Sequence, residues 1–307
     1  MKTAFLFPGQ GAQKIGMGMD LYDHNIIYKQ TFNECQDGAQ LDLQKACFLG
    51  DRMNESEVVQ PAIFAHSMSL LAVLRDAGFE ADIYAGLSLG EYSALTTAGA
   101  LDAAQCAALV RKRGRIMDNA YEKGVCGMLS VIGLDIDKVS SVIEDYDNVY
   151  VANHISELQI VISGYQSDLS ELEPVFLEQG AKMAAKLDVA GPFHSTLLSE
   201  AAKSFYDVLS AEPIGEFSKT VYANVLGKPY ESGSDVKQLL TDQMCTRVRW
   251  HECTENMISS GIDNYIEIGP GNVLGKLLKR RIGKDGASVA SINSAKTLDK
   301  FLAKAGQ

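Results

Sequence analysis

Residues 86–90 read Gly-Leu-Ser-Leu-Gly, and the segments that flank this box constrain the fold most strongly. The apolar run Ile83-Tyr84-Ala85 predicts a short buried strand before the box, and Glu91-Tyr92-Ser93-Ala94-Leu95 predicts a helix after it. A serine between two glycines at such a strand-to-helix turn is typical of a nucleophile elbow, because the turn is too tight for larger side chains. We therefore interpret Ser88 as a nucleophile. The alternative is a serine that only caps the helix in a glycine-rich turn.

Apolar periodicity predicts that strands and helices alternate along most of the chain. Apart from the elements that flank residues 86–90 and those between about 125 and 190, we expect strands at 3–7 and 264–268. We expect helices at 60–78, at 103–121 and from 273 onward. Between about 125 and 190 the expected order is strand, helix, strand, strand, helix, strand, at 128–132, 136–146, 149–152, 159–163, 167–179 and 182–189. That order is typical of a ferredoxin-like unit.

These elements predict the fold class and the domain organisation. We expect an α/β protein whose main domain, residues 1–124 plus 191–307, is hydrolase-like and contains a parallel sheet. A ferredoxin-like βαββαβ subdomain, residues 125–190, is expected to be inserted into this main domain. A chain of 307 residues is long enough to bury the cores of both parts.

Charge and cysteine content argue against several classes of protein. The formal net charge of −11 argues against a general nucleic-acid-binding role. The six cysteines are scattered without a Cys-x-x-Cys pair, so we expect neither a disulfide framework nor a zinc site. The apolar run at the N-terminus is too short for a signal peptide, and no apolar stretch approaches membrane-spanning length. We therefore expect a cytoplasmic protein that needs no membrane, metal or cofactor.

A serine hydroxyl becomes a good nucleophile when a base removes its proton, and histidine is the usual base at neutral pH. Among the five histidines, His194 is the best placed, in the turn Gly191-Pro192-Phe193-His194-Ser195 where the chain returns to the main domain. The others are His24, His66, His154 and His251. His154, at the end of a subdomain strand, is the alternative base, and we expect His66 to be a core residue of a helix.

The oxyanion that forms when the serine attacks needs at least two hydrogen-bond donors. The backbone N–H of Leu89 is one of them by the geometry of the elbow. The loop Pro8-Gly9-Gln10-Gly11 follows an early strand and is placed to supply the second donor. A plain glycine turn explains that loop equally well.

Arg113 raises the question of the substrate. It shares a helical stripe with apolar residues at positions 106, 109, 110 and 117, so we expect its side chain to face inward. A buried guanidinium requires an anionic partner, and a planar carboxylate fits it with two hydrogen bonds. The pattern therefore indicates either an anionic substrate or an internal salt bridge.

Together these motifs resemble the malonyl-CoA:acyl carrier protein transacylases of fatty-acid and polyketide synthesis. The resemblance extends over nearly the whole chain and rests on several motifs in order. They are Phe7-Pro8-Gly9-Gln10-Gly11-Ala12-Gln13, Gly86-Leu87-Ser88-Leu89-Gly90-Glu91-Tyr92, Arg113-Gly114, Gly191-Pro192-Phe193-His194-Ser195, Gln243 ahead of Val248-Arg249-Trp250, and Glu267-Ile268-Gly269-Pro270-Gly271.

The resemblance implies a role for each matching residue. Ser88 would be acylated, with His194 as its general base and acid, and the main-chain carbonyl of Gln243 would orient the histidine. Backbone N–H groups of Gln10 and Leu89 would form the oxyanion hole. Arg113 would bind the malonyl carboxylate. The activity would be transfer of malonyl from malonyl-CoA to the thiol of holo acyl carrier protein, through malonyl-Ser88 and without a cofactor.

Two positions depart from the family pattern. Leu87 stands before the nucleophile, where the family usually has histidine, and Thr246-Arg247 stands where a small residue and proline are usual. Two other functions also remain open: a serine thioesterase or esterase, which would release the acyl group to water, and a non-catalytic subunit that binds the carrier. The motifs fit carriers of either fatty-acid or polyketide synthesis.

Overall fold

The structure is a computed structural model, and it describes residues 1–283 and 286–305. The chain forms two compact units, and it passes between them several times. The first unit comprises Met1–Gly114, Pro213–Tyr222 and Asn256–Gln307. The second comprises Arg115–Glu212 and Ala223–Glu255. The protein is of mixed α/β type, with a parallel sheet in the first unit and a separate antiparallel sheet in the second.

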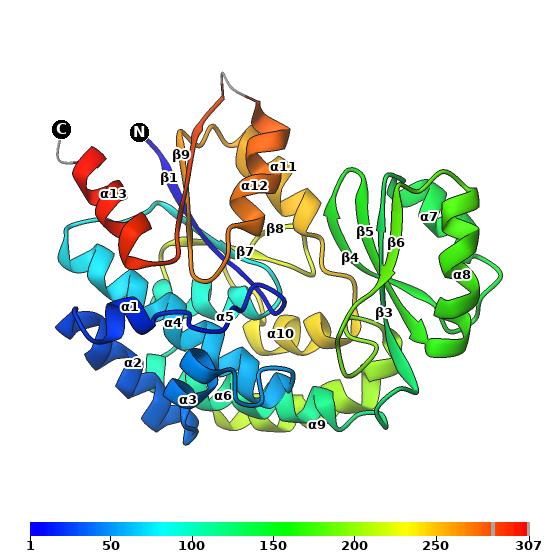
Figure 1. Cartoon of the computed structure of the whole chain (residues 1–307), viewed down its shortest axis with the longest axis horizontal. Coiled ribbons are helices and arrows are strands. Elements are labelled where there is room, and N and C mark those ends of the chain that lie inside the picture. Colours follow the sequence, from blue (N-terminus) through cyan, green and yellow to red (C-terminus); the bar gives the residue numbers. More distant parts are fainter. Residues whose placement is uncertain (284–285, 306–307) are drawn as a thin grey trace. The chain divides into compact units, whose positions relative to one another are not determined.

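The first unit is built on parallel strands in the order β10-β9-β1-β2-β7, of which β1, β7 and β9 are labelled in Figure 1. Their bounds are β1 Thr3–Phe7, β2 Ile83–Gly86, β7 Thr220–Ala223, β9 Asn264–Ile268 and β10 Ser288–Ile292. The strands β1, β2 and β9 are buried along nearly their whole length. A continuous apolar run of this kind is typical of a parallel strand that is covered on both faces.

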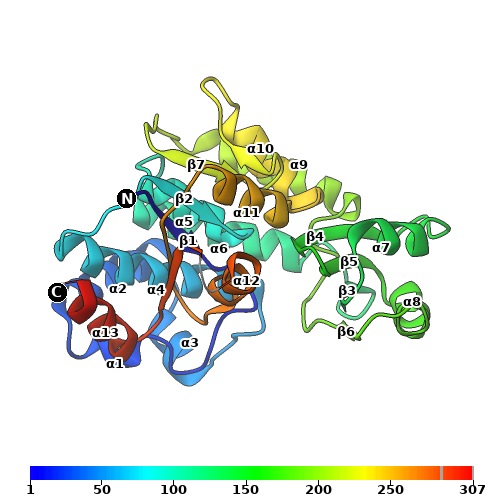
Figure 2. The same cartoon turned by 90° about the horizontal axis from the view of Figure 1, so that it is seen from above.

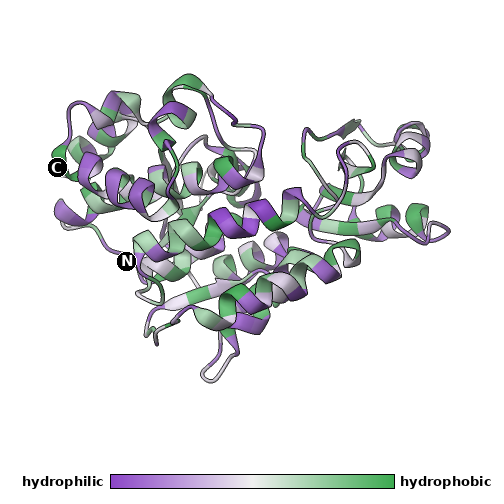
Figure 3. Cartoon of the chain, turned by 90° about the horizontal axis from the view of Figure 1, so that it is seen from below, coloured by the Kyte–Doolittle hydropathy of each residue, from purple (hydrophilic) through white to green (hydrophobic). Residues whose placement is uncertain are grey.

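Helices surround this sheet within the first unit. They are α1 Met19–Tyr22, α2 Ile26–Ala39, α3 Leu43–Leu49, α4 Ser56–Asp76, α5 Leu89–Thr97, α6 Ala103–Asp118, α12 Val273–Ile282 and α13 Ala295–Ala305. The end of α6 lies in the second unit, and α11, Trp250–Ser259, runs from the second unit into the first. Hydrophilic and hydrophobic residues alternate along many of the helices, as in Figure 3, because one face of each is buried.

Helix α4 forms much of the core of the first unit. It is the one helix among the described residues that is long and apolar enough to cross a membrane, but 89% of its apolar window is buried inside the structure. A core helix of a globular protein passes the same test. By length and composition α4 is thus an exception to the expectation that no apolar stretch approaches membrane-spanning length, although buried polar residues such as Gln60, His66 and Ser67 interrupt it.

The second unit contains a four-stranded antiparallel sheet of order β4-β5-β3-β6. Its elements are β3 Cys126–Ile132, α7 Ile136–Ile143, β4 Tyr150–Ser156, β5 Gln159–Tyr165, α8 Gln166–Glu178 and β6 Met183–Lys186. Helices α7 and α8 lie on one side of this sheet (Figures 1 and 2), and the apolar core between them includes Leu129, Ile162, Leu172 and Phe176. The rest of the unit comprises η1 Thr196–Leu198, α9 Ser199–Ala211, β8 Lys228–Pro229 and α10 Val236–Cys245.

The structure confirms the predicted order of elements between β3 and β6 and the strands at 3–7 and 264–268. Helix α4 begins at Ser56, before the expected residue 60, so Pro61 lies in its second turn. The predicted strand at 182–189 is shorter, because the chain leaves the sheet after Lys186 and remains irregular up to His194. That irregular stretch forms the turn that carries His194.

Candidate active site

Ser88 lies at the turn between β2 and α5, and its backbone is held in an unusual conformation. Its φ angle is +52°, in a region that residues other than glycine rarely occupy. A Cβ atom on Gly86 would collide with the backbone of Gly90, and one on Gly90 would collide with the carbonyl oxygen of Phe7. Both glycines are therefore required by the close packing of the turn against the end of β1, as expected for a nucleophile elbow.

The two predicted oxyanion donors lie on neighbouring segments of the first unit. Leu89 is the first residue of α5, whose opening N–H groups lack partners within the helix. Gln10 follows β1 in a loop that approaches the elbow so closely that a Cβ atom on Gly9 would collide with the carbonyl oxygen of Leu87. The structure thus places the loop of Gln10 beside the turn that carries Ser88.

Arg113 is only 1% exposed, and it reaches the same turn from α6. Its Nη2 donates a hydrogen bond to the hydroxyl of Ser88 at 3.0 Å, and its Nη1 donates to the amide oxygen of Gln60 at 2.8 Å. The guanidinium carbon lies 5.3 Å from the ring centroid of Tyr92. Burial lowers the pKa of Arg113, and the neighbouring Tyr92 and Glu91 act in the opposite direction. The inward orientation predicted for Arg113 is confirmed.

Gln60 is a site residue that the sequence analysis missed. Its side chain is buried near the start of α4 and connects Arg113 to the loop after β1, since Gln60 Nε2 donates to Gln10 Oε1 at 3.3 Å. Gln10 in turn donates to the hydroxyl of Ser56 at 3.1 Å. The available signal was a polar residue at the start of an otherwise apolar helix.

A glycine allows α6 to approach the start of α4. A Cβ atom on Gly114 would collide with the carbonyl oxygen of Ser56. This approach brings Arg113, the preceding residue, to the first turns of α4, where Gln60 lies. The pair Arg113-Gly114 therefore has a physical reason: the glycine allows the contact that positions the arginine.

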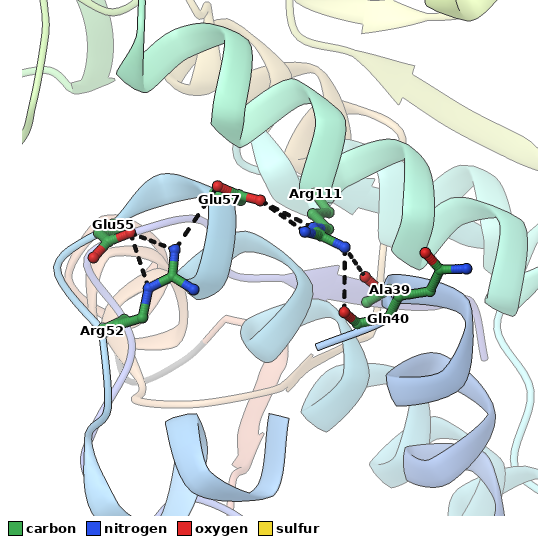
Figure 4. A network of polar contacts seen from close by, with 6 residues as sticks. All are labelled: Ala39, Gln40, Arg52, Glu55, Glu57 and Arg111. Carbon is green, nitrogen blue, oxygen red and sulfur yellow. Dashed lines mark hydrogen bonds and ion pairs between the residues drawn. The ribbon is translucent and has the colours of Figure 1, made fainter. Parts of the chain in front are cut away.

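An ion-pair network outside the buried site joins the same helices (Figure 4). Arg111 donates from two nitrogens to the carboxylate of Glu57, each at 3.0 Å. It also donates to the carbonyl oxygens of Ala39 and Gln40 at the end of α2, at 2.9 and 3.2 Å. Arg52 lies 3.8 Å from the other oxygen of Glu57. The network ties α2 and α6 to the first turn of α4.

His194 lies in the second unit, where carbonyl groups near the end of α10 hold it. Its Nδ1–H donates to the carbonyl oxygen of Gln243 at 2.6 Å, and its backbone N–H donates to that of Met244 at 3.1 Å. The last carbonyls of a helix lack partners within it and carry a partial negative charge. Because a carbonyl oxygen can only accept, the contact with Gln243 places the proton on Nδ1 and fixes the orientation of the imidazole ring.

The turn around His194 is anchored to the antiparallel sheet. The hydroxyl of Ser163 in β5, which is fully buried, donates to the carbonyl oxygen of Phe193 at 2.6 Å. The hydroxyl of Ser195 donates to the carbonyl oxygen of Pro192, also at 2.6 Å. These contacts hold His194 at a φ angle of +59°, which is again rare for a residue other than glycine.

The remaining histidines have other environments. His66 is fully buried, its Nδ1 lies 2.5 Å from the hydroxyl of Tyr28, and burial lowers its pKa to about 4, so it is the core residue we expected. His154 lies within β4, where its Nδ1 is 3.2 Å from a carboxylate oxygen of Glu252 and its ring centroid is 4.6 Å from that of His251. His24 is exposed.

The predicted site residues thus divide between the two units. Ser88, Leu89, Gln10 and Arg113 belong to the first unit, and His194 and Gln243 belong to the second. The six cysteines are all free, and the described part of the chain holds no cluster of three or more histidine, cysteine or acidic side chains that could bind a metal ion.

The comparisons with known proteins agree with this chemistry. A family model described as acyl transferase domain matches residues 4–302. The malonyl CoA-acyl carrier protein transacylase of Bacillus subtilis is 38% identical over 285 residues, which cover 91% of this chain and 90% of that protein. This chain belongs to the family of malonyl CoA-acyl carrier protein transacylases.

Solved structures resemble the chain over its whole length. The crystal structure of the transacylase from Clostridium perfringens has a TM-score of 0.94 and 36% identity, and the match covers 100% of this chain and 98% of that one. Another similar structure is a malonyl-transacylase in complex with a type II polyketide synthase acyl carrier protein, with a TM-score of 0.93, 33% identity and coverage of 99% and 100%.

Proposed function

We propose that this chain transfers a malonyl group from malonyl-CoA to the phosphopantetheine thiol of an acyl carrier protein. The observation that carries the proposal is the contact between Ser88, on a strained elbow, and the buried guanidinium of Arg113. This pair combines a nucleophile with a group that binds carboxylates. The names of the relatives, and the carrier complex of one of them, support the same assignment.

The first half of the proposed reaction forms malonyl-Ser88. Arg113 binds the free carboxylate of malonyl-CoA, and His194 takes the proton of Ser88 as the hydroxyl oxygen attacks the thioester carbonyl. Backbone N–H groups of Gln10 and Leu89 stabilise the oxyanion, where the loss of one donor typically costs about 10²–10³ in rate. The C–S bond then breaks, and His194 returns the proton to the sulfur of coenzyme A.

The second half reverses these steps with the carrier thiol. His194 takes the thiol proton, the sulfur attacks malonyl-Ser88, and Ser88 leaves with the proton from His194. The cycle is of the ping-pong type. The carbonyl of Gln243 takes the place that a carboxylate has in a hydrolase triad, and it holds the imidazole in one tautomer. No metal or cofactor takes part in this proposed cycle.

We also propose the finer description of the fold. The strand order β4-β5-β3-β6 supports a ferredoxin-like subdomain, and the elbow between β2 and α5 supports a hydrolase-like main domain. The division into residues 125–190 and residues 1–124 plus 191–307 stays a prediction. A cytoplasmic location is part of the same proposal, because malonyl-CoA and carrier would be met there.

Intact-mass measurement tests the proposed function. The protein mixed with malonyl-CoA is expected to gain one malonyl group, and added holo acyl carrier protein is expected to remove it and gain that mass. Rapid loss of the adduct in buffer without carrier would instead identify a thioesterase. A protein that forms no adduct would be a non-catalytic binding subunit, and the proposal would be wrong.

The carrier is expected to dock through the basic end of α12. Lys279, Arg280 and Arg281 are exposed there, and acyl carrier proteins are generally acidic. Replacing the three by glutamate is expected to raise the KM for the carrier about tenfold at low salt and less at high salt, as for exposed charge contacts. The malonyl-CoA half-reaction should be unchanged.

A matched control comes from α13, where Lys296, Lys300 and Lys304 form a second exposed basic row. Their replacement by glutamate changes the net charge by the same amount. It is expected to leave the KM for the carrier close to that of the unmodified protein. Equal effects of the two triple variants would show that net charge, and not the α12 surface, controls carrier binding.

A further inference from the structure

The nucleophile and the carboxylate-binding group already touch each other in the structure. Nη2 of Arg113 donates to the hydroxyl oxygen of Ser88 at 3.0 Å. Both residues lie in the first unit, so the contact belongs to one compact part of the chain. A hydroxyl oxygen that accepts this hydrogen bond has a lone pair directed at the guanidinium. A hydroxyl oxygen has two lone pairs, so this bond does not block attack, but it draws electron density from the oxygen and lowers its nucleophilicity toward a thioester carbonyl.

The guanidinium is held in this position by its surroundings. Gln60 accepts from Nη1 at 2.8 Å, the ring of Tyr92 lies beside the guanidinium carbon, and the side chain is almost fully buried. Gly114 lets α6 approach α4 at this level. Arg113 therefore has almost no contact with solvent, and a ligand that binds it must compete with hydrogen-bond partners such as Ser88 and Gln60.

A carboxylate competes strongly for this guanidinium. A carboxylate pairs with a guanidinium as an ion of opposite charge, and it accepts two parallel hydrogen bonds from it. The hydroxyl of Ser88 is neutral and accepts one. In a malonyl group the free carboxylate is separated from the thioester carbonyl by a single methylene. The same group therefore brings a competitor for Arg113 and a target for Ser88.

We propose that the hydrogen bond from Arg113 to Ser88 is a latch that restrains the nucleophile until a substrate carboxylate takes over the guanidinium. This inference rests on the proposed function and adds a second selection step to it. An acetyl group has no carboxylate, so it would bind less well and would also meet a restrained serine. Arg113 would then discriminate through the reactivity of Ser88 as well as through binding.

A neutral reagent that reacts with serine, combined with a separate carboxylate, tests the latch. Methanesulfonyl fluoride is a small neutral reagent: the serine oxygen bonds to sulfur, the S–F bond breaks, and fluoride leaves while the serine proton passes to a base. Formate supplies a carboxylate without an acyl group. We expect saturating formate to speed sulfonylation of Ser88 about tenfold, the worth of one typical hydrogen bond, relative to chloride at the same ionic strength. Intact mass over time gives the rate.

Two variants sharpen the test. Arg113→Met lacks the latch, so it is expected to react at the raised rate from the start and to show no response to formate. Arg115→Met, at an exposed position two residues further along α6, is expected to behave like the unmodified protein. Slower sulfonylation of Arg113→Met than of the unmodified protein would mean that the guanidinium activates Ser88, and the latch would be wrong.

The formate response also separates this inference from the proposed function. A sulfonylation rate that formate leaves unchanged, or lowers, overturns the latch even where malonyl transfer to the carrier is intact. A chain that shows the formate response but forms no malonyl adduct keeps the latch and loses the proposed function. The reagent needs no recognition of coenzyme A, so the two outcomes are independent.

Discussion

Replacing Ser88 with alanine is expected to lower malonyl transfer by roughly 10⁶-fold, the size of effect seen when a catalytic serine is removed. The variant lacks the oxygen that forms the covalent intermediate, so no malonyl adduct should be detectable by intact mass. The elbow should keep its shape, because Gly86 and Gly90 set its packing against Phe7. Binding of malonyl-CoA, measured by calorimetry, should therefore survive the substitution.

Leu87→Ala is the matched control from the adjacent position. Leu87 is partly exposed, and its side chain cannot take part in proton transfer. Its backbone N–H donates to the carbonyl oxygen of Phe7 at 3.0 Å, and alanine keeps that contact. We expect a loss of less than about tenfold, in line with one lost packing contact. A loss as large as that of Ser88→Ala would mean that the turn, and not the hydroxyl, controls the rate.

Replacing His194 with alanine is the second change with a large expected effect, roughly 10⁴-fold or more in kcat, because the base and acid of both half-reactions are lost. Malonyl-CoA should still bind to the variant. Single-turnover kinetics should show that formation of malonyl-Ser88 and its transfer to the carrier are both slowed. If the substitution slows only one half-reaction, the other half-reaction uses a different base, and His154 is the first candidate for it.

Met244→Leu is a control that separates the side chain of Met244 from the main-chain carbonyls that contact His194. The histidine contacts the carbonyl oxygens of Gln243 and Met244, and leucine keeps that main chain while filling a similar buried volume. We expect kcat to change by less than about threefold. A loss comparable to that of His194→Ala would show that the side chain, and not the carbonyl at the end of α10, positions the imidazole.

Short-range patterns in the sequence predicted the parts of the site that depend on neighbouring residues. The elbow at Ser88 follows from two glycines between a strand and a helix, and the inward face of Arg113 follows from helical periodicity. The residues that make up each of these patterns lie within about one helix length of each other in the sequence. The strands of the parallel sheet were found in the same way where their apolar runs were continuous, as in β1 and β9.

Contacts between distant segments were beyond such patterns. Gln60 contacts Arg113 because α6 approaches α4, and that approach depends on Gly114. Ser163 supports the turn of His194 from a strand far away in sequence. His154 was considered as a base, yet it lies beside Glu252, a partner almost a hundred residues further along the chain. Each of these residues takes its role from tertiary packing.

The backbone at Ser88 and His194 has a consequence for attempts to make this protein more robust. Both residues have positive φ angles, which cost about 1–3 kcal/mol each in a residue other than glycine. A search for stabilising substitutions would test glycine at these positions, since glycine adopts positive φ angles without a steric penalty. Thermal stability and catalysis would therefore be selected in opposite directions at the same two residues. Variants chosen for heat resistance alone are the ones most at risk of becoming well-folded and inert.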